Sequence, residues 1–218
     1  MSPTLDVVDR WDGGISWTLE EDSMHRTSHA LGTDAGVWII DPVDAPGLDD
    51  ELDELGDVAG VTLLLDRHKR DSEVVARRHD VPVSLPAALG PVADELDAQA
   101  ERYAGSLPGT EFRTVRLTNN RFWREVALFD ADRGTLVVPE AVGTNELFST
   151  SDERLGVHPV LRLFPPRQAL GGLEPERVLV GHGPGVFDDA AAALRYALGN
   201  SRRNAPKLYA QAALTPFK

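Results

Sequence analysis

Residues 61–73 place the pattern of a buried strand directly before a run of ionisable side chains. Val61–Leu65 is apolar or β-branched throughout, as in a strand that is buried on both faces. Asp66–Asp71 contains only charged or ionisable residues, and Ser72–His79 has apolar residues at helical spacing. Because α/β proteins hold ligands in the loops that follow buried strands, this stretch predicts an α/β fold with a functional site after the strand.

The rest of the chain repeats this order of strands followed by helices. Strands are expected at Leu5–Val8, Ile15–Leu19, His25–Leu31, Val37–Ile40, Val81–Val83, Phe112–Leu117, Glu125–Phe129, Gly134–Val138 and Pro175–Val180. Helices are expected at residues 45–57, Ala93–Ala104 and Asp188–Leu198. Two successive sets of strands and helices indicate a single domain over residues 1–218. The layout is that of a four-layer αββα sandwich with a C-terminal tail at residues 199–218.

The composition restricts both the partners and the chemistry. The formal charge is −13 and the pI is near 4.8, which argues against sequence-independent binding to nucleic acid or to an anionic membrane. The chain has no cysteine, so disulfides, zinc–thiolate sites and cysteine nucleophiles are excluded. No apolar run approaches the ~20 residues of a membrane span, and we find no secretory signal, which predicts a cytoplasmic protein. Few lysines and an excess of aspartate over glutamate resemble the composition of halophilic proteins from salt-loving archaea.

Three stretches together resemble one known family. Trp38–Pro42 closes a short strand, and the hairpin Glu125–Val138 leads directly to Glu140. Val178–Gly183 ends a further strand in Gly-His-Gly before a helix. The order and spacing of these stretches resemble the metallo-β-lactamase fold over nearly the whole chain. The resemblance implies the same αββα sandwich, with ligands for divalent metals at the strand ends.

The resemblance also implies which positions would bind metal. The family's signature is His-x-His-x-Asp-His, and the corresponding positions here are Asp66, His68, Arg70 and Asp71. Glu140 stands where the family places a bridging aspartate, and His182 matches its last histidine. Residues 117–123, which should hold a further histidine, contain none. Of these positions, two are histidines, three are carboxylates and one is an arginine.

Two interpretations of this cluster remain open. In the first, Arg70, which cannot lose its proton, pairs with Asp66, Asp71 or Glu140, so that an ion-pair network replaces the metals. In the second, nitrogen and oxygen ligands hold a single divalent metal such as Zn, Mn or Fe. The ligands in that case would be Asp66, His68, Asp71, Glu140 and His182. An intact two-metal site is the least favoured on ligand count.

These interpretations predict different functions. The first predicts a non-hydrolytic or weakly active protein with a small-molecule ligand or a structural role. The second predicts a mono-metal hydrolase that uses His68, His182 and carboxylates. A third hypothesis is a subunit that binds a partner protein, or a homo-oligomer, through the basic segment Arg202–Lys207. The sequence names no substrate, because specificity in this fold lies in variable loops.

The other histidines and Trp123 are interpreted as structural. His29 is expected to pack on a strand, and His79 to end a helix, where its positive charge suits the helix dipole. His25 and His158 fall in expected loops beside no other candidate ligand. Trp123 is expected to be an ordinary half-buried strand residue.

Overall fold

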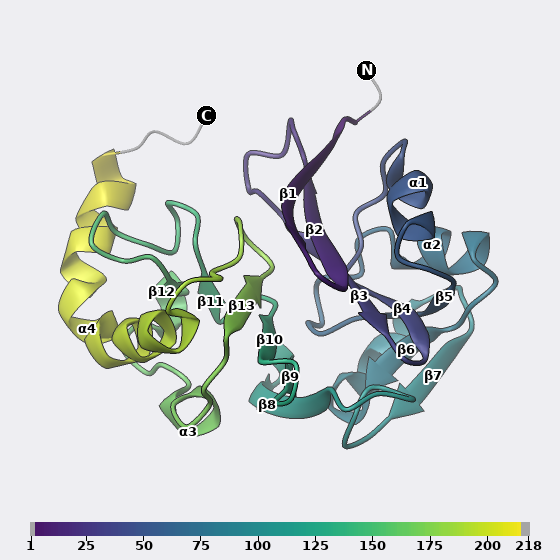
Figure 1. Ribbon diagram of the computed structural model, residues 1–218. Coiled ribbons are helices and arrows are strands. Elements are labelled where there is room, and N and C mark those ends of the chain that lie inside the picture. Colours follow the sequence, from purple (N-terminus) through teal and green to yellow (C-terminus); the bar gives the residue numbers. More distant parts are fainter. Residues whose placement is uncertain (1–2, 215–218) are drawn as a thin grey trace.

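Two β-sheets packed between helices make up the protein in a computed structural model, which describes residues 3–214 (Figure 1). The strands of the first sheet follow one another in sequence order, antiparallel up to the fourth strand and parallel beyond it. They are β1 (Leu5–Trp11), β2 (Gly14–Leu19), β3 (Ser28–Thr33), β4 (Gly36–Ile40), β5 (Val58–Thr62), β6 (Val83–Pro86) and β7 (Ala100–Tyr103).

The second sheet has the order β13-β10-β9-β8, with β10 and β13 parallel. Its strands are β8 (Arg113–Asn120), β9 (Trp123–Asp130), β10 (Thr135–Val138) and β13 (Arg177–Val180). A two-stranded ladder pairs β11 (Val142–Gly143) with β12 (Gly156–Val157). The helices are α1 (Leu48–Asp53), α2 (Ser72–Arg78), α3 (Arg167–Leu170) and α4 (Ala190–Leu214), with 3₁₀ turns η1 (Ala87–Glu95) and η2 (Pro159–Leu161).

Three apolar clusters hold the four layers together. Leu52 of α1 and Val75 of α2 are buried against the outer face of the first sheet. Trp38 and Leu179 belong to the cluster between the two sheets. Leu194 of α4 belongs to the cluster on the outer face of the second sheet. Since each sheet face is covered, the predicted αββα sandwich is confirmed.

The stretch after β5 links the two sheets. The sequence predicts a strand at Val61–Leu65, but the strand spans Val58–Thr62. Leu64 lies beyond it, and its carbonyl accepts from Val126 N of β9 in the second sheet at 2.9 Å. Leu65 forms a bridge with Glu125. The apolar run is therefore split, because its last residues cross from one sheet to the other.

The helix expected at Ala93–Ala104 is wrong. η1 ends at Glu95, and β7 then adds an edge strand to the first sheet. Residues 96, 98 and 100 are half-buried and alternate with exposed neighbours, which is the period of a strand. Pro91, which lacks an amide hydrogen, lies inside η1 and disfavours a regular α-helix there.

The last helix is longer than expected. The sequence predicts a helix over Asp188–Leu198, whereas α4 continues to Leu214 and includes Pro206. Residues 199–214 of the expected tail are thus helical. Within residues 3–214, no helix is long and apolar enough to cross a membrane.

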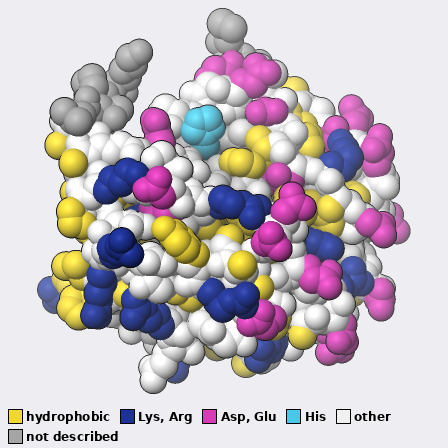
Figure 2. Space-filling model, turned by 60° about the vertical axis from the view of Figure 1, so that its left-hand side comes forward, with side chains coloured by type: hydrophobic (Ala, Val, Ile, Leu, Met, Phe, Trp, Pro, Cys, Tyr) yellow, Lys and Arg dark blue, Asp and Glu magenta, His cyan; other side chains and the backbone are white. Residues whose placement is uncertain are grey.

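Charge is distributed unevenly along the chain. Residues 1–143 contain 28 acidic and 13 basic residues, whereas residues 144–218 contain seven acidic and nine basic ones. The second group includes α3 and α4. Figure 2 shows the molecule with the side that carries α4 in Figure 1 turned forward. In this view, basic and hydrophobic side chains lie together on the left, and acidic side chains gather on the right. The strong negative charge therefore belongs to the first sheet, its helices and the central hairpins.

Candidate metal centre

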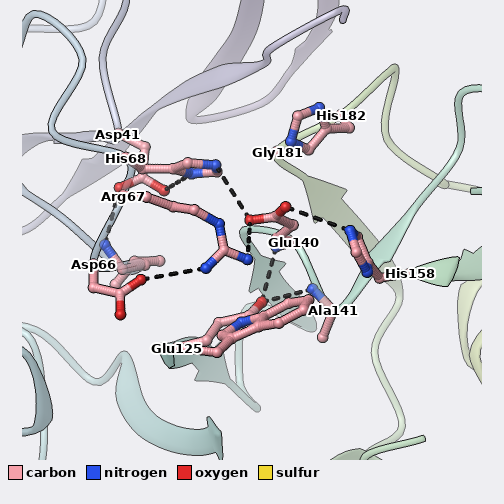
Figure 3. Close-up of polar contacts among 12 residues, drawn as sticks. Asp41, Asp66, Arg67, His68, Glu125, Glu140, Ala141, His158, Gly181 and His182 are labelled. Atoms are coloured by element: carbon pink, nitrogen blue, oxygen red, sulfur yellow. Dashed lines mark hydrogen bonds and ion pairs between the residues drawn. The ribbon is translucent and has the colours of Figure 1, made fainter. Parts of the chain in front are cut away.

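The candidate site lies where four strands end. β4 and β5 are parallel neighbours in the first sheet, and β10 and β13 are parallel neighbours in the second. The segments that follow their carboxyl ends carry Asp41, His68, Glu140 and His182. Figure 3 shows these side chains directed toward one another from the two halves of the sandwich. The loop position agrees with the prediction made from residues 61–73.

Asp41 fixes the orientation of His68. The Nδ1 atom of His68 donates to Asp41 Oδ2 at 3.0 Å, and both side chains are buried. The other carboxylate oxygen of Asp41 accepts from Leu64 N at 2.9 Å. With its proton on Nδ1, the imidazole presents the Nε2 lone pair to the site. This carboxylate–histidine arrangement is the one that commonly orients metal-binding histidines.

His182, like His68, is held by a hydrogen bond from its Nδ1 atom. Its Nδ1 donates to the carbonyl of Met24 at 3.1 Å, and its ring stacks on Phe148 with centroids 5.2 Å apart. The flanking glycines allow a close approach of two loops. A Cβ on Gly181 would lie 2.1 Å from Pro139 O, and Gly183 has a positive φ of 92°. Larger residues in place of Gly181 or Gly183 would therefore push this loop, and His182 with it, out of position.

Glu125, a residue of β9, holds the loop that carries Glu140. Its Oε1 accepts from the amides of Glu140 and Ala141 at 2.8 and 2.7 Å. Its Oε2 accepts from Trp123 Nε1 at 2.8 Å. Glu125 is fully buried, and burial raises its pKa to about 7. Three donated hydrogen bonds therefore fix both the carboxyl group and the loop.

His68, Glu140 and His182 each offer a ligand atom, and these atoms lie within 4.8 Å of one another. His68 Nε2 is 3.8 Å from Glu140 Oε2, a buried oxygen that forms an ion pair with Arg67 NH2 at 3.0 Å. His158 adds a third imidazole, with Nε2 3.5 Å from Glu140 Oε1 (Figure 3). Two nitrogens and one oxygen, with a further nitrogen beside them, fit a single transition metal.

Burial keeps the three imidazoles neutral at pH 7. It lowers the pKa of His182 and of His158 to about 4, and the pKa of His68 falls well below its ordinary value. Nearby arginine charges act in the same direction for each histidine. Neutral imidazole is the form that binds metal, because its free nitrogen keeps a lone pair.

Comparison with solved structures shows what this geometry resembles. DIM-1 metallo-β-lactamase matches with a TM-score of 0.64 at 12% identity, over 93% of this chain and 99% of that one. A putative diflavin flavoprotein fragment from Nostoc sp. PCC 7120 matches with a TM-score of 0.64 at 13% identity, over 93% and 98% of the chains. The mono-zinc form of FIM-1 from Pseudomonas aeruginosa matches with a TM-score of 0.57 at 9% identity, over 93% and 97%. The protein has the metallo-β-lactamase fold. No protein-family profile and no curated protein sequence matches the chain.

Arg70, which stands at the position that corresponds to the signature's aspartate, has a different role from the expected one. It does not pair with Asp66, Asp71 or Glu140 through any hydrogen bond in the described part of the chain. Its NH1 donates to the carbonyls of Thr27 and Asp41, each at 2.8 Å. Carbonyl oxygens from two strand ends thus accept from its NH1 in the place of carboxylates, while its buried Nε has no hydrogen-bond partner among the described residues. Burial lowers the pKa of Arg70 to about 10, so it stays charged at pH 7.

Asp66 and Asp71 lie outside the cluster that the metallo-β-lactamase fold brings together. Asp66 Oδ2 accepts from Arg124 N at 2.9 Å, which helps to join the two sheets. Asp71 Oδ2 accepts from Asp44 N at 2.9 Å, beside the start of α2. Both carboxylates are already used by backbone amides. Of the five ligands expected from the sequence, the structure brings together His68, Glu140 and His182.

Four residues of the site were not assigned to it from the sequence: Asp41 and Glu125, which hold the candidate ligands, and His158 and Arg67, which contact Glu140. His158 precedes η2 in a segment without periodicity, so no sequence signal places it beside Glu140. Arg67 is the neighbour of the expected ligands, and its NH2 is 3.0 Å from Glu140 Oε2. Its guanidinium carbon lies 4.4 Å from the ring centroid of Trp123, which is therefore a stacking partner. The cation expected at Arg70 is instead supplied by Arg67.

Proposed function

We propose that this protein binds one divalent transition metal through His68, Glu140 and His182 and acts as a mono-metal hydrolase. The observation that carries the proposal is the anchoring of both histidines at Nδ1, by Asp41 and by the Met24 carbonyl. This anchoring leaves both Nε2 atoms free beside the same carboxylate. Structural histidines in a core have no need to converge in this way.

The donor set suits zinc, manganese or ferrous iron. Imidazole favours zinc and iron, and one carboxylate among two imidazoles leaves positions open for substrate or water. A metal of this kind polarises a carbonyl or phosphoryl oxygen and lowers the pKa of water. In the protein, Asp41 holds the tautomer of His68, and Glu125 holds the backbone of Glu140. Arg67, which is partly exposed at the site, provides a cation for an anionic part of a substrate.

A specific contact favours a second candidate function. Arg67 lies 3.0 Å from Glu140 Oε2, the same oxygen that a metal would use. If this pair is kept in solution, the site holds an ion pair in place of a metal, and the protein is a non-hydrolytic member of the fold with a small-ligand or structural role. The two candidates differ in whether a metal displaces Arg67 from Glu140.

Metal content separates the two candidates. The protein is purified without chelator, reconstituted with Zn, Mn or Fe(II), and measured by plasma mass spectrometry. We expect about one metal per chain in the wild type and loss of that metal in His182→Ala. His79→Ala is the matched control, because His79 ends α2 and contacts Asp49 away from the site. Absence of metal under all conditions would support the non-hydrolytic function.

Activity tests the hydrolase claim separately. The loaded protein is assayed against lactam, carboxylic ester and phosphoester substrates. We expect hydrolysis of at least one class that is lost with the metal in His182→Ala. A protein that binds one metal and hydrolyses none of these substrates would retain the metal site and refute the hydrolase.

A further inference from the structure

The segment around η2 turns its hydrophobic side chains outward and its charged one inward. Val160, Leu163 and Phe164 are 72%, 52% and 79% exposed. Arg162, between them in the sequence, is 0% exposed. Burying the charge of an arginine lowers the stability of the fold, and large apolar side chains that stay exposed do not stabilise it. The hydrophobic effect and the hydration of charge would favour the opposite orientation, with the arginine exposed and the apolar side chains buried.

A buried ion pair fixes the outward orientation. Arg162 donates through both terminal nitrogens to the carboxylate of Glu153, at 3.0 and 2.8 Å, and also to Phe148 O. Asn204 of α4 donates to the same carboxylate at 3.0 Å. Both terminal nitrogens of Arg162 thus donate to the forked pair, and Asn204 ties the shared carboxylate to α4, so the pair holds the segment against α4. The exposed apolar side chains therefore belong to a segment that is held in place by buried hydrogen bonds.

Helix α4 extends this surface. Tyr209, which is partly exposed, donates from its hydroxyl to Pro159 O at 2.9 Å. Arg202 donates to Leu163 O at 2.6 Å, and its guanidinium carbon lies 5.7 Å from the Phe164 ring centroid. We define the apolar patch as Val160, Leu163, Phe164 and Tyr209. Contiguous exposed groups of this kind mark interaction surfaces in soluble proteins.

The charge distribution indicates what covers the patch. Two copies of a chain with a charge of −13 repel each other through most of their surfaces. The patch lies in the part of the chain, residues 144–218, that has nine basic and seven acidic residues. In the view of Figure 2, basic and hydrophobic side chains are mixed on the left and acidic side chains gather on the right. Residues 144–218, which contain the patch, therefore contribute less repulsion between two copies than residues 1–143 do.

We propose that the apolar patch is the interface through which two copies of this chain form a symmetric dimer. In a two-fold dimer the same patch meets itself, so apolar groups pair with apolar groups and no separate partner site is needed. Phe164 would lie near the centre, with Arg202 at its edge. The proposal is independent of the metal site, since the patch residues are not among the ligands.

Sedimentation velocity at micromolar concentrations tests the dimer. We expect the wild type at about twice the chain mass of 23.7 kDa. Leu163→Ser with Phe164→Ser should raise the dissociation constant at least about tenfold, since central aromatic groups dominate such interfaces. Both side chains are exposed, so the variant should fold, and circular dichroism checks this. Raising the salt from about 0.15 M to about 1 M should tighten the wild-type dimer, because it screens the repulsion between acidic copies.

Phe122→Ser is the matched control. Phe122 is 74% exposed at the turn between β8 and β9, outside the patch, and its removal should leave the dissociation constant unchanged. A wild type that stays monomeric at these concentrations would overturn the proposal. So would a dimer that the patch variant leaves intact, or one that dissociates as salt is raised.

Discussion

At the scale of single residues, the site is defined by groups that hold the ligands as much as by the ligands. Asp41 gives His68 its tautomer, and Glu125 gives the Glu140 loop its position. Asp71 was expected to bind metal from the sequence, yet its carboxylate accepts from a backbone amide. The difference matters because a supporting carboxylate and a ligand respond differently to replacement by the corresponding amide.

Replacing Asp41 by Asn should weaken metal binding about 10–100-fold, the range for lost support of a histidine ligand. The new amide would face Nδ1 of His68 with a donor and favour the wrong tautomer. Competition with a coloured chelator measures the affinity for zinc. Asp71→Asn is the control and should keep wild-type affinity. Equal losses in both variants would show that Asp71 is a ligand after all.

Glu125 should make stability depend on pH. Burial raises its pKa to about 7 in the folded state, above its ordinary value of 4.5. The folded state therefore binds more protons than the unfolded state between these values. The free energy of unfolding should fall as pH rises through this window, by about 3 kcal/mol from this group at most. Glu125→Gln removes the titration.

Urea unfolding with chelator present, at pH 5, 6, 7 and 8, measures this effect. The slope of the unfolding free energy against pH should be smaller for Glu125→Gln than for the wild type, whatever the absolute stability of the variant. Identical slopes would mean that Glu125 is ionised in the folded protein over the whole range.

At the scale of elements, strand ends and tight loops position the ligands. Gly183 has a φ of 92°, and a Cβ there would lie 2.4 Å from Thr144 Oγ1. Gly183→Ala should therefore lower the free energy of unfolding by about 1–3 kcal/mol and displace His182. Gly199→Ala is a matched substitution inside α4, where a Cβ meets no atom within 4 Å.

Chemical denaturation checks this pair of variants. Gly199→Ala should be neutral or up to about 1 kcal/mol more stable, because alanine favours a helix. Gly183→Ala should also bind zinc more weakly than Gly199→Ala. If both variants matched the wild type in stability and affinity, the close approach of the two loops would not constrain His182.

The elements also show where sequence reasoning succeeds and fails. Val37–Ile40 and Ser72–His79 are strongly patterned, and they form β4 and α2 within one residue of the expected limits. Residues 93–104 fail because alternation of half-buried side chains is weak in an alanine-rich segment. His158 is placed beside Glu140 by long-range packing of η2, which leaves no local pattern. The convergence of His68, Glu140 and His182 was predictable from the strand ends that carry them, whereas the partners of Arg70 were not, because they are backbone carbonyls that leave no sequence signal.

At the scale of the whole molecule, the acidic part of the chain determines how the protein responds to salt. The charge of −13 destabilises the compact state through self-repulsion, which salt screens. The melting temperature should therefore rise between about 0.15 M and 2 M KCl, by about 4–8 °C if the gain is ~2 kcal/mol. Asp53→Asn with Asp57→Asn removes two exposed charges and should show a smaller rise. A melting temperature that falls in high salt would refute this account and the halophilic interpretation.

The central claim is that two strand ends from each sheet create one metal site from His68, Glu140 and His182. Anomalous diffraction from crystals soaked in zinc tests it most directly. We predict a single peak about 2.0–2.2 Å from Nε2 of both histidines and from a carboxylate oxygen of Glu140, with Arg67 moved away. Two peaks at this site, or none there while zinc binds elsewhere on the protein, would contradict the account.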